Sequence, residues 1–108
     1  VHLGSDFPVV GLEPMEEIYG AVFRMLEDGS NPEGWFPEER ITMGDALRAY
    51  TYGSAYAMHA EDRIGTLSCG KQADVCVLDR NLFDCAPEEV LEATSAFTMI
   101  AGKVVFEA

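Results

Sequence analysis

Apolar residues recur with a helical period in the first half of the chain, after Pro14. The first helix is expected to begin at Glu13-Pro14, because proline suits a first turn, where its missing N–H has no helical partner. It is expected to stop near Gly29. Its apolar face carries Met15, Ile18, Tyr19, Val22, Phe23, Met25 and Leu26. So wide a stripe is typical of a helix that packs on a sheet.

A second helix is predicted from Thr42 onward. Thr42 is the expected N-cap residue, with Asp45 three positions later in an arrangement close to a capping box. One face of this helix carries Ala46, Leu47, Tyr50, Gly53, Ser54 and Ala57. The small residues at 53–55 indicate close approach to another backbone, and the alternative is that Gly53 marks a break in the helix.

Strand-like patterns stand at the start of the chain and in its second half. The apolar opening before Gly4 predicts a short strand. The run 74–79 has the length of a strand and is expected to be covered on both faces. Residues 87–91 are expected to form a short helix or a turn. Residues 98–106 predict a β-hairpin with Ala101-Gly102 at its turn and the glycine at positive φ, in a turn or a bulge.

The composition is that of an acidic globular protein, with 48% apolar and 24% charged residues. The net charge of −12 argues against binding to nucleic acid, whose phosphates require Lys and Arg, and against anionic membrane surfaces. The acidic residues are spread along the chain, which favours a solvated surface over an acidic docking face. No apolar run reaches the ~18 residues of a membrane span, and we expect no signal peptide.

The chain contains three cysteines, Cys69, Cys76 and Cys85. Their spacing includes no Cys-x-x-Cys and indicates neither a zinc site nor a disulfide framework. We therefore expect reduced, mostly buried thiols in a cytoplasmic protein.

Residues 65–72 nearly match the phosphate-binding loop G-x-x-x-x-G-K-[ST]. The match fails because Gln72 has no hydroxyl for magnesium, and because a strand and not a helix is predicted to follow. Nucleotide binding is not expected here. Gly65 and Gly70 are instead expected to take positive φ in two turns that flank a short strand.

Few other residues suggest catalytic chemistry. His2 and His59 belong to no metal-binding pattern, and Ser5 is not in a Gly-x-Ser-x-Gly elbow. Trp35 and Phe36, on a loop between the helices, are expected to plug a pocket, with lining one as the alternative.

Asp6 is the remaining candidate. It follows Gly4-Ser5, just past the carboxyl end of the predicted opening strand, where α/β enzymes place catalytic and metal-binding side chains. An Asp after Gly-Ser is also commonly a turn or N-cap residue. Spacing alone leaves both interpretations open.

Six motifs stand in a fixed order along the chain, and they are Gly4–Pro8, Glu13-Pro14, Arg40–Thr51, Ala55–Ala57, Ile64–Asp79 and Ile100–Val105. Ile64–Asp79 is the most specific of them, because several of its residues stand at fixed spacing. Taken together, these motifs resemble the amidohydrolase superfamily, in particular the metal-dependent hydrolases of the YtcJ-like, amidohydrolase-3 type. The resemblance covers essentially all 108 residues in order.

The resemblance implies an α+β fold class. It predicts the last βα unit of a (β/α)8 (TIM) barrel, then a helix, then the carboxyl-terminal strands of a composite β-sandwich built from both chain ends. Residues 1–57 are expected to be the barrel segment and residues 58–108 the sandwich strands.

The resemblance also implies a function for the intact protein, namely metal-dependent hydrolysis of a C–N bond other than a peptide bond in a small-molecule substrate. Asp6 matches the family's aspartate at the end of the eighth strand. That residue ligates a divalent metal, zinc being the first expectation, and takes a proton from the metal-bound water.

The family's other metal ligands have no match in this chain, and one carboxylate cannot hold zinc. The fragment alone is therefore expected to be inactive, to bind no cofactor specifically, and to self-associate through its barrel-facing surface. The alternative is a non-catalytic structural or interaction module derived from the sandwich domain.

Overall fold

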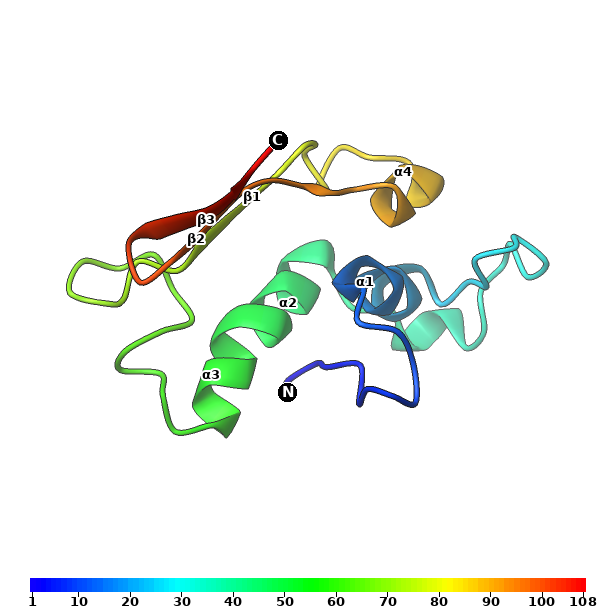
Figure 1. The fold of residues 1–108 in the computed structure, drawn as a ribbon. Helices are drawn as coiled ribbons and strands as arrows, with labels where there is room; N and C mark the ends of the chain where they lie inside the picture. The colour runs from blue at the N-terminus through cyan, green and yellow to red at the C-terminus, as the bar shows by residue number, and fades with distance from the viewer.

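The computed structural model describes all of residues 1–108. Its strands form one sheet, and its helices lie beside that sheet (Figure 1). The helices are α1 (Pro14–Phe23), α2 (Met43–Arg48), α3 (Ser54–Ala57) and α4 (Pro87–Leu91). A 3₁₀ turn covers Pro37–Glu39, and a π-helical turn, Ala49–Gly53, joins α2 to α3. The strands are β1 (Val75–Leu78), β2 (Ser95–Ile100) and β3 (Lys103–Glu107). No helix combines the length and the apolar character needed to span a bilayer.

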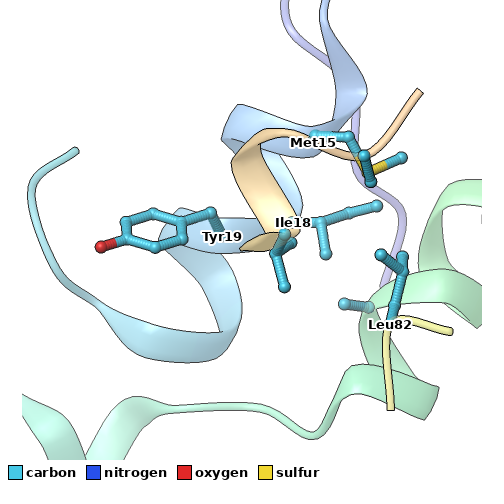
Figure 2. Packing of buried hydrophobic residues seen from close by; sticks show 7 residues of the cluster. Met15, Ile18, Tyr19 and Leu82 are labelled. Carbon is cyan, nitrogen blue, oxygen red and sulfur yellow. The ribbon is translucent and has the colours of Figure 1, made fainter. Parts of the chain in front are cut away.

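The core lies where α1 packs against α2 and α4 (Figure 2). Ile18, only 2% exposed, points with Met15 toward Leu82, whereas the Tyr19 ring extends to the other side. The buried cluster is Met15, Ile18, Tyr19, Ala46, Leu82, Val90 and Ala93. The apolar stripe of α1 is thus buried against helices and not, as predicted, against a sheet. The boundary expected between the barrel segment (1–57) and the sandwich strands (58–108) stays a prediction. The core contains residues of both segments.

Helix α1 ends at Phe23, so the prediction that it continues to Gly29 is wrong. Arg24 takes the left-handed conformation, φ 58°, and its N–H bonds to the Gly20 carbonyl. The side chain of Asn31 replaces the next helical turn, since it accepts from the Leu26 N–H and donates to the Arg24 carbonyl. Polar groups that a longer helix would have satisfied are therefore satisfied by the following loop.

Residues 1–5 form no strand, contrary to prediction. A strand needs a hydrogen-bonded neighbour, and the three strands of this chain pair only with one another. The short strand predicted between Gly65 and Gly70 is also absent. Both glycines have the predicted positive φ, 89° and 91°. Lys71 stabilises this region by donating to the carbonyls of Glu61 and Ile64.

The predicted terminal hairpin is confirmed. Strand β2 pairs antiparallel with β1 on one side and β3 on the other, with Ile100 opposite Lys103. Ala101 and Gly102 both take positive φ, 51° and 78°, as a tight hairpin turn requires. The short helix predicted at 87–91 is α4.

Both faces of the sheet are open, so the prediction that β1 is covered on both faces is wrong. Val77 is 48% exposed, and every residue of β3 is exposed. Among the strand residues, Leu78 alone packs on the core. The radius of gyration, 14.7 Å, accordingly exceeds the roughly 13 Å expected for a compact domain of this length.

Two expectations about individual side chains are also corrected. The prediction of mostly buried thiols is wrong, because Cys69 and Cys76 are exposed and Cys85 is half-buried. Trp35 is 69% exposed and plugs no pocket, and the neighbouring Phe36 is exposed as well. Their loop is held through its backbone, since Arg40 donates to the carbonyls of Phe23 and Glu33, and the rings need no burial.

Two aspartates hold the ends of the sheet. Asp74 accepts from the Ala101 N–H at 2.8 Å and from the Gln72 side chain, and these bonds lower its pKa. Asp79 accepts from the Arg80 guanidinium at 3.1 Å and from the Thr94 N–H, and these bonds lower the pKa of Asp79 in the same way. Ionised carboxylates therefore tie β1 to the hairpin turn and to the start of β2.

The core assignment predicts a difference between two valines. Val90→Ala removes two methyl groups from a fully buried side chain, and we expect the free energy of unfolding to fall by about 2–3 kcal/mol. Val9→Ala makes the same change where the side chain is 77% exposed, and a change within about 0.5 kcal/mol is expected. Urea unfolding measures both, and equal losses would contradict the burial of Val90 in the core.

Acid is expected to destabilise the chain through Asp74 and Asp79. Their folded-state pKa lies below the unfolded value of about 3.9. Their contribution is therefore present above about pH 4 and lost as pH falls through the folded-state pKa. Asp74→Asn and Asp79→Asn are expected to reduce the stability difference between about pH 6 and pH 3. The exposed Asp62→Asn serves as control, and identical acid dependence in all variants would contradict this role.

Candidate functional site

Asp6 lies at the start of a tight turn. Its φ is 53°, in the left-handed region that Asp tolerates better than most residues. Its backbone carbonyl accepts from the Val9 N–H at 2.9 Å, and the Phe7–Pro8 peptide bond within the turn is cis. The turn interpretation of Asp6 is thus confirmed. Its side chain is exposed, so the carboxylate remains accessible to a reacting group.

The segment that leads to Asp6 lies against the helical stretch from α2 to α3 (Figure 1). Ser54 Oγ donates to the Leu3 carbonyl at 3.1 Å, across 51 residues of sequence. A Cβ at Gly53 would overlap the Val1 carbonyl oxygen and lie 3.4 Å from His2 Cα. The close backbone approach predicted for residues 53–55 is therefore confirmed, and its partner is the start of the chain.

The helical stretch changes its winding where this contact occurs. Thr42 caps its start as predicted, because its Oγ1 accepts from the Asp45 N–H at 3.1 Å. Ala49–Gly53 is wound as a π-helix, and the Ser54 N–H bonds back to the Ala49 carbonyl. Gly53 keeps helical backbone angles, φ −60° and ψ −43°, so it does not break the helix. π-Turns of this kind occur frequently at functional sites.

Two grooves flank this helical stretch. The first, about 690 Å³, lies between it and the start of the chain and is lined by residues that include His2, Asp45, Arg48 and Tyr52. The second, about 870 Å³, lies between it and the sheet, with Leu67 and Asp74 among its residues. Asp6 lines neither of them.

The chain does not by itself fit a metal centre. No group of three or more His, Cys, Asp and Glu side chains comes together anywhere in it. A zinc site takes roughly three or four protein ligands, and Asp6 is the one candidate that the motif provides. His2 lines the first groove, and His59 lies in a turn after α3 with φ 55°.

A family model of the amidohydrolase family matches residues 1–106. Together with the motifs from Gly4 to Val105, this match defines the class of protein: the chain belongs to the amidohydrolase family, in the amidohydrolase-3 group that the resemblance indicated.

Named relatives are similar over nearly the whole chain. Protein LONG AFTER FAR-RED 3 of Arabidopsis thaliana is 36% identical over 104 residues, which are 96% of this chain and 17% of that protein. N-substituted formamide deformylase of Arthrobacter pascens is 36% identical over 107 residues, 99% of this chain and 19% of that protein. The putative amidohydrolase YtcJ of Bacillus subtilis is 30% identical, over 96% of this chain and 20% of that protein. The chain thus spans about a fifth of the length of these curated relatives.

A solved structure shows the same fold. The crystal structure of an amidohydrolase from Thermotoga maritima superposes with a TM-score of 0.59 at 24% identity, over 95% of this chain and 22% of that chain. The α+β arrangement is thereby confirmed as one found within an amidohydrolase. The assignment of residues 1–57 to a barrel stays a prediction.

The contact at Gly53 predicts different effects for the same substitution at two helical glycines. Gly20→Ala, where an added Cβ meets nothing within 4 Å, is expected to raise the free energy of unfolding by about 0.5–1 kcal/mol through better helix propensity. Gly53→Ala is expected to lower it by about 1–3 kcal/mol, because the methyl group displaces residues 1–3. Chemical unfolding measures both, and equal stabilisation would contradict the contact.

Proposed function

We propose that the intact protein is an amidohydrolase that cleaves a C–N bond other than a peptide bond in a small molecule, and that this chain contributes Asp6 to the active site. Membership of the amidohydrolase family supports the class of reaction. The name of one relative, N-substituted formamide deformylase, describes the removal of a formyl group from nitrogen, which is cleavage of such a bond.

The accessible carboxylate of Asp6, at a turn within the Gly4–Pro8 motif, is the observation on which the proposal rests most. In the proposed mechanism, Asp6 takes a proton from the attacking water and passes it to the leaving nitrogen. The nitrogen needs this proton because an amine leaves far more readily than its anion. Both transfers require the carboxylate within about 2.6–3.2 Å of the exchanging atom.

The metal remains part of the proposal for the intact protein only. Asp6 would be one ligand of a divalent ion, with zinc as the first expectation, and the other ligands would come from outside these 108 residues. We accordingly propose that the chain alone is inactive. We further propose that the isolated chain self-associates through its barrel-facing surface, where the apolar side chains of Val1 and Phe7 are exposed.

Asp6→Asn in the full-length protein tests the proposal. The amide cannot accept the proton, and we expect kcat for formamide, urea or amide substrates to fall by about 10²–10⁴-fold. Asp62→Asn, an exposed aspartate outside the motif, is the matched control and is expected to keep full activity. Retained activity in Asp6→Asn would remove Asp6 from the mechanism. A full-length protein that hydrolyses none of these substrates would favour the non-catalytic module.

A further inference from the structure

The hydrogen bond from Ser54 to Leu3 is the one hydrogen bond between residues 1–5 and the rest of the chain. Leu3 also packs its side chain against the core, while Gly4 has nothing within 4 Å of the position of an added Cβ. Leu3 is therefore fixed by a hydrogen bond and by packing, whereas Gly4 has open space beside it. Three residues reach at most about 10 Å, so the anchor at Leu3 limits where Asp6 can lie.

The π-helical turn leaves the Ser54 hydroxyl proton available for this bond. Ser54 Oγ is 3.1 Å from both the Leu3 and the Ala49 carbonyl oxygens, and it has one proton to donate. The Ala49 carbonyl already accepts the Ser54 backbone N–H. The Leu3 carbonyl has no other donor. Donation of the Ser54 proton to the Leu3 carbonyl is therefore favoured, because without it this carbonyl would have no hydrogen-bond donor.

We propose that Ser54 is a positioning residue for Asp6, acting through the Leu3 carbonyl, with Gly53 providing the space for the backbone contact. The inference rests on the proposed function of Asp6. Ser54 touches no reacting atom. It restricts the carboxylate to positions from which protons can be exchanged with water and with the leaving nitrogen, and displacements of about 1 Å in such a group are costly to the rate.

Variants of the full-length protein test the role of Ser54, with formanilide as the substrate probe. Ser54→Ala is expected to lower kcat per folded molecule about tenfold, with little change in KM. Ser54→Thr keeps a hydroxyl and is expected to restore most of the rate. Thr51→Ala is the matched control, since the Thr51 hydroxyl bonds only to the Leu47 carbonyl of its own helix, and wild-type kinetics are expected.

Crystal structures of the full-length variants give a readout that is independent of activity. The Asp6 Cα is expected to move by about 1 Å in Ser54→Ala relative to wild type, and to keep its wild-type position in Ser54→Thr and Thr51→Ala. An unmoved Asp6, or an unchanged kcat in Ser54→Ala while Asp6→Asn is inactive, would overturn the positioning role and leave the proposed function intact. Activity in Asp6→Asn would instead overturn the proposed function itself.

Discussion

The burial of Ile18 and Val90 in one cluster with Leu82 holds the two halves of the chain together. Helix α1 alone is too short to be stable in water, and α4 has only five residues. Each of these two helices is stabilised because it buries apolar side chains against the other. The loop Arg24–Arg40 follows α1, and β1 ends at Leu78, which packs on the cluster. The positions of both segments therefore depend on this cluster. The sheet adds little to the core, because Leu78 is the one strand residue that packs against this cluster.

The candidate site depends on the same cluster through α2. Helix α2 packs on α1 through Ala46, and the π-helical turn that follows α2 presents Gly53 and Ser54 to the start of the chain. Small side chains are required there, because two backbones meet without room for a Cβ. Packing in the core is thus connected to the position of Asp6 by a short series of contacts. A change in α1 would be expected to reach Asp6 by this route.

Local features could be predicted from the sequence. The Thr42–Asp45 cap, the helix at Pro87 and the Ala101-Gly102 turn involve residues a few positions apart, where backbone preferences decide the outcome. Features that depend on distant residues could not. The end of α1 is set by the Asn31 side chain, and the Ser54–Leu3 bond joins residues 51 positions apart.

Exposure was predicted least well. The apolar character of β1 indicated burial, yet burial depends on what covers a strand, and within this chain Cys76 and Val77 at its centre stay exposed. The same reason applies to the opening segment, which has no neighbouring strand to pair with. Asp6 is a candidate because its Gly4–Pro8 motif is local, whereas the family match extends over residues 1–106. Ser54, which bonds to the Leu3 carbonyl in the same segment as Asp6, could not be predicted, because it lies 51 residues from Leu3 in the sequence.

A crystal structure of the full-length protein is the most direct test of the claim that this chain contributes Asp6 to a hydrolase active site. We expect the Asp6 carboxylate to face the active-site cavity alongside the remaining catalytic groups, with the Ser54 hydroxyl bonded to the Leu3 carbonyl. An Asp6 side chain directed to bulk solvent, away from that cavity, would contradict this claim.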